Sequence, residues 1–226
     1  MATVSRPTPV HEPREIRVLV HDVAWDGYEA MLQIVDERHI RVTYDAGSME
    51  VCMPSQRHEQ AAQWLGLFVT RLAEELEVPY EPLGMTSWKK ASVAKGIEPD
   101  QCYYLQNHEV VRRESPLDLE TDPPPDLAIE VDITSSSLNR MAIYAALGVP
   151  EVWRYDGQTL AVNQLQPDGQ YQSSATSHAF PGLQPSDVEH FMELGRTIDK
   201  VRWARTLRDW VRDELIPRRA RERPHG

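Results

Sequence analysis

Cysteine and cationic side chains are scarce in this chain of 226 residues. The 2 cysteines are too few for a disulfide framework or a cysteine-rich zinc site, so Cys52 and Cys102 are expected to be buried and reduced. Lys and Arg number 24 against 35 Asp and Glu, which gives a net charge of −11. That balance argues against broad, nonspecific binding of nucleic acid, which needs concentrated cations, but it leaves room for a local basic groove.

Long apolar runs are missing as well. No stretch reaches the length of a membrane span, and the first residues lack the apolar core of a signal peptide. We therefore expect a cytoplasmic protein with no membrane partner. The chain also lacks a glycine-rich phosphate loop, a serine nucleophile elbow and a Cys–His pair. These absences direct the search for chemistry to the carboxylates.

The order of helical and strand patterns predicts one α+β domain with a mixed sheet. Residues 1–15 are rich in proline and charge and are expected to form a loose tail. The domain is expected over 16–195, followed by a C-terminal helix at 196–216 and a basic, flexible tail at 217–226.

Local patterns place several elements within that domain. A turn at Ala46–Ser48 joins two strands, with Gly47 supplying the positive φ. A long helix is expected after Ser55, which is a plausible N-cap. The run SSSLNRMAIYAALG predicts a helix capped by Ser136 or Ser137, ending at Gly148, with a buried face of Leu138, Met141, Ala142 and Ala145.

The stretch DLAIEVD carries acids inside an apolar run. As a strand, it alternates between faces, so Leu127, Ile129 and Val131 point into a core. Glu130 and Asp132 then point the other way. Because a helix and a second strand should flank this strand, we expect it to be central. Buried acids are costly unless something positive neutralises them, and a divalent cation does so well.

Asp100 stands at the start of the neighbouring strand, in the stretch GIEPDQCYYL. Asp100 and Glu130 together would form a two-carboxylate site of the kind that Mg²⁺ accepts. A metal held there could activate a water and stabilise charge on a phosphodiester. The spacing leaves a plainer alternative open, in which Glu98 and Asp100 are turn and cap residues and Glu130 makes a structural salt bridge.

Four stretches resemble the Uma-type putative restriction endonuclease family of bacteria, within the PD-(D/E)XK nuclease superfamily. They are YDAGSMEVCMPSQRHE, GIEPDQCYYL, PPDLAIEVDITSSSLNRMAIYAALGVPEVWRYDG and AFPGL. The resemblance implies a restriction-endonuclease-like fold, with a mixed central sheet flanked by helices, here with an added β-meander and C-terminal helices. It also implies an endonuclease that uses Mg²⁺ or Mn²⁺ and acts on DNA. RNA or another phosphodiester stays open, and a homodimer is a further expectation.

The same resemblance assigns roles to particular residues. Asp100 and Glu130 match the metal-binding acids, and the carbonyl of Val131 would be a further ligand. His58 and Glu59 match a position at the start of the long helix that supports the site. Their alternative interpretation is a solvated histidine and an acid favoured by the helix dipole.

One position departs from the superfamily pattern. Lysine is expected two residues after Glu130, where this chain has Asp132. An aspartate cannot supply that positive charge, although it could bind a second metal or accept a proton. Arg140 and Tyr144 lie four residues apart on one helix face, and Arg140 could stabilise a phosphate or, alternatively, form a surface salt bridge. The departure supports a second hypothesis, a catalytically degenerate nuclease fold kept as a binding or assembly module. Glu98 is expected to flank the site.

Overall fold

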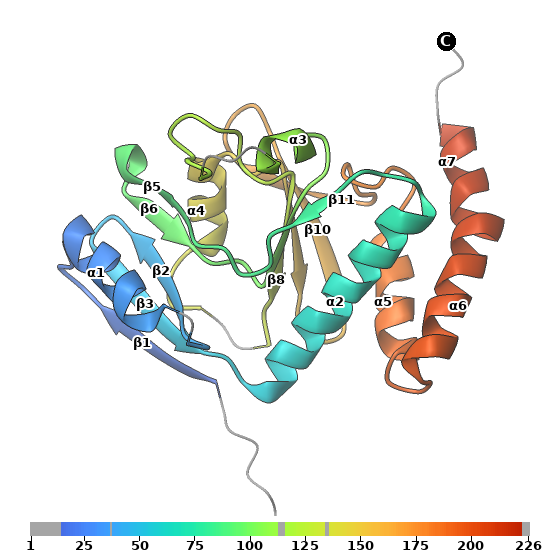
Figure 1. The fold of residues 1–226 in the computed structure, drawn as a ribbon, viewed down its shortest axis with the longest axis horizontal. Helices are drawn as coiled ribbons and strands as arrows, with labels where there is room; N and C mark the ends of the chain where they lie inside the picture. The colour runs from blue at the N-terminus through green and yellow to red at the C-terminus, as the bar shows by residue number, and fades with distance from the viewer. Residues whose placement is uncertain (1–14, 37, 113–115, 134–135, 223–226) are drawn as a thin grey trace, which may run out of the picture.

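A computed structural model describes residues 15–36, 38–112, 116–133 and 136–222. Most of the expected N-terminal tail, residues 1–14, and the last four residues lie outside this description. The described chain forms two β-sheets with helices packed around them, which confirms the α+β class (Figure 1).

The first sheet is antiparallel throughout, with the strand order β1-β3-β2-β6-β5. The turn between β2 and β3 contains Gly47 at φ 98°, as predicted. Helix α1 covers one face of this sheet, where Tyr28 packs among Val42, Tyr44 and Met49. The bounds are β1 Ile16–Val20, α1 Trp25–Val35, β2 Arg41–Asp45, β3 Ser48–Met53, β5 Trp88–Lys90 and β6 Lys95–Ile97, with a 3-10 turn at Ala91–Val93.

The second sheet has the strand order β11-β10-β9-β8-β7-β4 and is mixed, because β8 runs parallel to β9 while the other pairs are antiparallel. The expected meander, β9 to β11, forms one side of this sheet rather than a separate addition. Helix α4 packs on one face, and α2, α5 and α6 pack on the other (Figure 1). The bounds are β4 Glu81–Pro82, β7 Gln101–Tyr104, α3 His108–Val111, β8 Leu127–Val131, α4 Arg140–Leu147, β9 Glu151–Tyr155, β10 Leu160–Leu165 and β11 Tyr171–Ser174.

The alternation predicted for β8 is confirmed by the two cores that it separates. Leu127, Ile129 and Val131 belong to the larger core under α2, α5 and α6. Ala128 belongs to the smaller core with Ile143 of α4. Strand β8 is therefore covered on both faces, and all five of its residues are buried.

Three residues carry the chain from one sheet to the other. Strand β6 belongs to the first sheet and β7 to the second, and only Glu98, Pro99 and Asp100 lie between them. Pro99 has no N–H to satisfy, which suits a segment that has left one ladder and not yet joined the next. The stretch GIEPD is therefore the junction of the two sheets.

Helix α2 (Gln56–Glu75) begins as predicted, since the Ser55 side chain accepts a hydrogen bond from the backbone N–H of His58 at 3.2 Å. Its buried residues, among them Leu65, Val69 and Leu72, recur at helical spacing and pack on the second sheet. The helix therefore has one face in the core and its N-terminus at the junction of the sheets.

Helix α4 differs from the prediction at its start. Its N-cap is Asn139, whose side chain accepts a hydrogen bond from Ala142 N, and not Ser136 or Ser137. The two serines instead bind the carboxylate of Glu50 on β3. The predicted cap was wrong because these serines have a partner distant in sequence, which a local pattern cannot show.

The buried face of α4 also differs from the predicted one. Ile143, Tyr144 and Leu147 are the buried residues, whereas Met141 is only partly buried and Ala142 is exposed. The reason is that the helix face carrying Tyr144 packs against the second sheet. The end of the helix is as predicted, with Gly148 at φ 80°.

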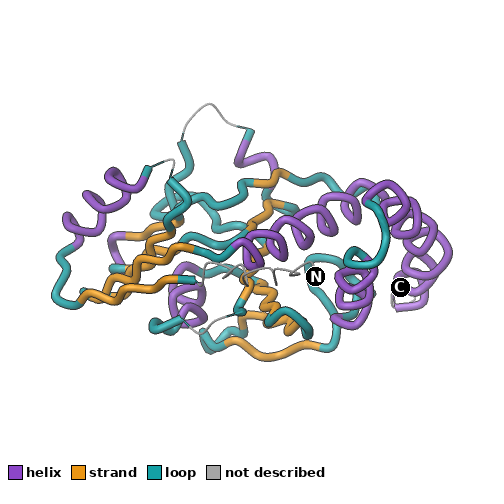
Figure 2. The backbone as a smooth tube through the Cα atoms, turned by 90° about the horizontal axis from the view of Figure 1, so that it is seen from below, coloured by secondary structure: helices purple, strands orange, loops and turns teal. Residues whose placement is uncertain are grey.

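The C-terminal helices lie against the outer side of α2, at the end of the molecule away from α1 (Figures 1 and 2). Trp203 on α6 is fully buried and meets Trp64 of α2 at a ring separation of 5.2 Å. Residues 217–222, expected in the basic tail, continue the helix in this structure. In the described part of the chain no helix is long and apolar enough to cross a membrane. The bounds are α5 Pro185–Leu194, α6 Lys200–Trp210, a π-helical segment at Val211–Leu215 and α7 Ile216–Glu222.

Both cysteines are buried and free, as predicted. Burial raises the pKa of the Cys102 thiol to about 12, and burial likewise raises the pKa of Cys52 to about 12. Neither thiol is therefore available as a nucleophile near neutral pH.

Leu72→Ala tests the larger core. Leu72 is fully buried, so its removal should lower the free energy of unfolding by about 2–5 kcal/mol. Val201→Ala, at a side chain that is 63% exposed on α6, is the control and should change little. Urea titration of both variants measures the difference, and equal stabilities would contradict this description of the core.

Candidate functional site

The candidate site lies where the first sheet, the second sheet, α2 and α4 meet. Its side chains come from segments far apart in the sequence. The contributors are Arg41 and Thr43 of β2, Glu50 of β3, His58 and Glu59 of α2, Asp100 before β7, Glu130 of β8, and Arg140 and Tyr144 of α4.

Asp100 and Glu130 lie opposite each other on neighbouring strands. The antiparallel register of β7 and β8 pairs Gln101 with Ile129, so the preceding residue, Asp100, faces Glu130. Asp100 N donates to Ile129 O at 3.0 Å, and Val131 N donates to Asp100 Oδ2 at 2.5 Å. The exposed fractions of Asp100 and Glu130 are 1% and 4%, respectively. The structure therefore brings the two predicted metal-binding acids together and buries both.

Side chains from α2 and β2 contact Asp100. Its Oδ1 atom forms an ion pair with Arg41 and lies 2.8 Å from His58 Nε2. Arg41 Nη2 also donates to Glu59 Oε1 at 2.6 Å. Of the two residues expected to support the site, His58 therefore contacts Asp100 directly and Glu59 acts through Arg41.

Glu130 is held by the two α4 residues expected to share a face. Its Oε1 atom accepts a hydrogen bond from Arg140 Nη2 at 2.6 Å and another from the Tyr144 hydroxyl. Arg140 also donates to Thr43 Oγ1 at 2.8 Å and to the Glu98 carbonyl at 2.9 Å. Arg140 is thus a buried link between the two sheets, not a surface salt bridge.

The charges of these two residues follow from their surroundings. Burial by itself lowers the pKa of Arg140, but the Glu130 carboxylate outweighs burial and holds that pKa above its usual range. Burial, followed by the charge of Glu130, raises the pKa of Tyr144 well above 10. Near neutral pH, Arg140 is therefore a cation and Tyr144 a neutral hydrogen-bond donor.

Asp132 lies directly after β8, and its side chain accepts from Arg154 Nε on β9 at 2.6 Å. One pocket of about 390 Å³, which we call the main pocket, is lined by Glu130, Asp132, Arg140, Arg154 and Asp156. The pocket therefore carries three acids and two arginines, and the cations come from α4 and β9 instead of from position 132.

Glu98 lies beside the site and faces away from the main pocket. Its side chain accepts from Ser87 Oγ at 2.7 Å and lines a separate pocket of about 170 Å³ with Arg41 and Glu59. Burial raises the pKa of Glu98 above its usual value. Glu98 thus lies two residues before Asp100 and lines a different pocket from Glu130.

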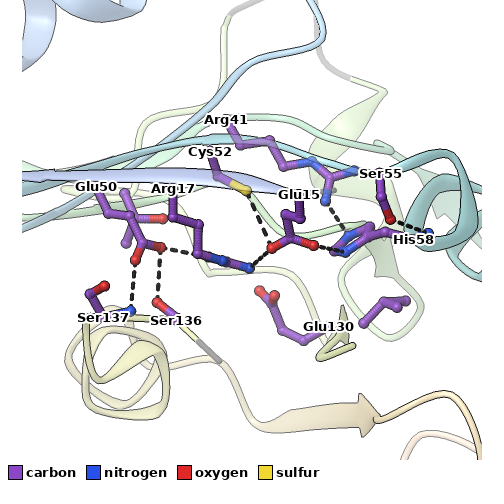
Figure 3. Close-up of polar contacts among 12 residues, drawn as sticks. Glu15, Arg17, Arg41, Glu50, Cys52, Ser55, His58, Glu130, Ser136 and Ser137 are labelled. Atoms are coloured by element: carbon purple, nitrogen blue, oxygen red, sulfur yellow. Dashed lines mark hydrogen bonds and ion pairs between the residues drawn. The ribbon is translucent and has the colours of Figure 1, made fainter. Parts of the chain in front are cut away.

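The sequence analysis missed Glu50, a buried acid on β3 that fixes the loop before α4. Its carboxylate accepts from Arg17 Nη1 at 2.6 Å, Ser136 Oγ at 2.9 Å and Ser137 N at 2.7 Å (Figure 3). A signal for it existed, because Glu50 interrupts the apolar run SMEVCM just as Glu130 interrupts DLAIEVD.

Glu15 and Arg17 extend this network from Glu50 to His58. Glu15 Oε2 lies 3.2 Å from His58 Nδ1, and its other oxygen forms an ion pair with Arg17 (Figure 3). The His58 ring therefore contacts Glu15 through Nδ1 and Asp100 through Nε2. Glu15 gave no local signal, because it lies at the edge of the proline- and charge-rich start of the chain.

The donor atoms suit a divalent metal in type. Asp100 and Glu130 supply carboxylate oxygens, the ligands that Mg²⁺ prefers. One oxygen of each is engaged by an arginine, Arg41 for Asp100 and Arg140 for Glu130. Among the described residues, no three His, Cys, Asp or Glu side chains are grouped closely enough to hold an ion. A metal here would therefore use two carboxylates with backbone, water or phosphate oxygens.

Comparison with known proteins decides the family. Residues 25–199 match the model of the Uma2 family, described as "Putative restriction endonuclease". The chain belongs to this family. The matched range contains every acid of the site except Glu15, and the membership supports a nuclease as the function.

A solved structure is also similar, although the likeness is distant. It is titled as a "putative nuclease" of the DUF820 group from Anabaena variabilis ATCC 29413. It is 15% identical, covers 67% of this chain and 90% of its own, and has a TM-score of 0.48. No curated protein matches the chain.

Glu50→Gln tests the network behind the site. Burial by itself raises the pKa of Glu50, but the hydrogen bond from Ser137 N and the charge of Arg17 outweigh burial and lower this pKa. A pKa lowered by folding means that the charged carboxylate stabilises the protein above its unfolded pKa, and this stabilisation is lost as the pH falls. The variant should therefore be less stable at pH 7 by about 1–3 kcal/mol, with a smaller gap in acid.

Urea unfolding at neutral and acidic pH measures this gap. Glu109→Gln makes the same change at a side chain that is 73% exposed and should have little effect. A gap for Glu50→Gln that stays constant with pH would show that the Glu50 charge does not stabilise the fold.

Proposed function

We propose that the protein is a divalent-metal-dependent endonuclease that hydrolyses phosphodiester bonds of DNA. The observation that carries this proposal is that Asp100, directly before β7, lies next to Glu130 of the neighbouring strand β8, and that Glu130 and Arg140 line the same pocket. Membership in a restriction endonuclease family supports it.

Asp100 and Glu130 would hold Mg²⁺ or Mn²⁺, and the carbonyl of Val131 is the further ligand that the superfamily pattern implies. Bound there, the metal would supply Lewis acidity and lower the pKa of a water molecule. Tyr144 and Arg140 orient the Glu130 carboxylate by binding its Oε1 atom. The second oxygen of Glu130 can then take the ligand role.

The chain's own cations face the negative charge that develops on the phosphate. Arg140 lines the pocket and is permanently protonated, so it can stabilise this charge but cannot accept a proton. Arg154, which also lines the pocket, donates a hydrogen bond to Asp132. In this proposal Asp132 would accept a proton from the attacking water or bind a second ion. Arg140 and Arg154 would supply the positive charge that the lysine of the superfamily pattern provides.

Glu130→Gln should abolish cleavage, because the amide keeps the shape of the side chain but supplies no negative charge to a metal. We expect nicking of supercoiled plasmid DNA in Mg²⁺ or Mn²⁺ by the wild type, a loss of at least about 100-fold in the variant, and no activity in EDTA. Agarose gel electrophoresis measures the rate of nicking.

Glu109→Gln, at an exposed position on α3, is the matched control and should nick at the wild-type rate. Thermal unfolding shows whether Glu130→Gln remains folded. Equal nicking by wild type and a folded Glu130→Gln protein would refute the assignment of Glu130.

A second function has its own supporting observation. Arg41 and Arg140 already neutralise Asp100 and Glu130, so the acids are balanced without an ion, and Asp132 stands where lysine is expected. This arrangement favours a binding or assembly module that has kept the nuclease fold and lost the reaction.

Calorimetric titration with Mn²⁺ in the presence of a short DNA duplex separates the two functions. A nuclease should bind Mn²⁺, and Asp100→Asn should weaken this binding by about 10–100-fold. Wild-type protein with no measurable Mn²⁺ binding, even with DNA present, would favour the module.

A further inference from the structure

A second hollowed surface lies beside the main pocket, along the exposed side of α2. It consists of two pockets of about 600 and 940 Å³ that share Gln60, Trp64 and Arg196 in their linings. We call this surface the α2 groove and define it by Arg57, Gln60, Gln63, Trp64, Arg196 and Lys200.

The charge of the α2 groove is opposite to that of the chain. Arg57, Arg196 and Lys200 line it, and none of the described lining residues is acidic, although the whole chain has a net charge of −11. Arg57 forms no ion pair with any described residue. Arg196 pairs with Glu193 at 2.8 Å, but both side chains are exposed, so that pair is weak. Concentrated cations with glutamine amides between them suit a polyanion with many phosphate oxygens.

Packing holds part of the groove in place before any ligand binds. Lys200 Nζ lies 5.5 Å from the centre of the Trp64 ring, a cation–π contact that positions the ammonium group. Gly195 allows the backbone to pass close to Trp64, since a Cβ there would lie 3.1 Å from the ring. A cation that is already positioned loses less side-chain entropy when it binds a phosphate.

The α2 groove and the main pocket approach each other where β8 and β9 end. At the end of β8, Asp132 lines the main pocket and the next residue, Ile133, lines the groove. The end of β9 repeats this arrangement with Asp156 and Gly157. Arg196 of the groove is held at the end of β9, because its Nη2 atom donates to the Gly157 carbonyl at 2.8 Å. Because consecutive strand residues face opposite sides, the pocket and the groove open on the two faces of the second sheet, and a polymer bound beside Glu130 would reach the groove around the ends of β8 and β9.

We propose that the α2 groove binds the phosphodiester backbone of the DNA strand that enters the main pocket. The inference rests on the proposed nuclease function, because it takes the bound polymer to be the substrate. Backbone contacts carry no sequence information directly, so binding through this groove should depend strongly on salt and weakly on base sequence.

The test is the double variant Arg57→Gln/Lys200→Gln, with Arg71→Gln as the matched control. Arg71 lies on the same helix, is also exposed and lines neither pocket of the groove. Fluorescence anisotropy with labelled single-stranded and duplex DNA, in EDTA and over a range of NaCl concentrations, measures binding without cleavage. The double variant should bind roughly tenfold or more weakly, and the slope of log K against log[salt] should fall by about 2. Arg71→Gln should match the wild type.

Three results would overturn the inference. They are wild-type affinity and salt slope in the double variant, no salt-dependent DNA binding by the wild type, and displacement of DNA by poly-glutamate as efficient as by unlabelled DNA. The nicking assay with Glu130→Gln judges the reaction separately. Loss of binding in the double variant, together with a wild type that nicks no DNA, would support the groove and refute the proposed hydrolysis.

Discussion

Two buried contacts between an arginine and a carboxylate hold the two sheets together, and the candidate site depends on them. Arg140 reaches Thr43 in the first sheet and Glu130 in the second, while Arg41 of the first sheet pairs with Asp100. A buried acid without a counter-charge is strongly unfavourable, and so is a buried guanidinium without an acid. Each arginine therefore stabilises its carboxylate. Both acids can be buried at the same place because each has an arginine beside it.

This arrangement gives the protein two differently charged surfaces side by side. The main pocket combines three acids with two arginines. The α2 groove beside it has cations and amides in its described lining and no acid. A chain with excess negative charge can therefore still offer a path to a polyanion, because local charge, and not net charge, decides where phosphates bind.

The accuracy of the sequence analysis depended on the distance over which each interaction acts. Helix α2 with its Ser55 cap and the turn at Gly47 were predicted, because their causes lie within a few residues. The start of α4 was not, since Ser136 and Ser137 bind Glu50, which is 86 residues away from Ser136 in the chain. Local patterns describe the backbone's own preferences, and they contain no record of partners that only folding brings close.

Sequence patterns were enough to predict the family and the mixed α+β class, both of which are confirmed. They also singled out Asp100 and Glu130, because alternation along a strand shows when an acid stands on a covered face. The partners of these two acids depend on the tertiary structure. Arg41, His58, Arg140 and Tyr144 converge on the two acids from three different elements, and Glu15 and Glu50 join through contacts across the first sheet. The reason is physical: the energy of a buried charge depends on the atoms within a few ångströms of it, and those atoms become neighbours only when the two sheets meet.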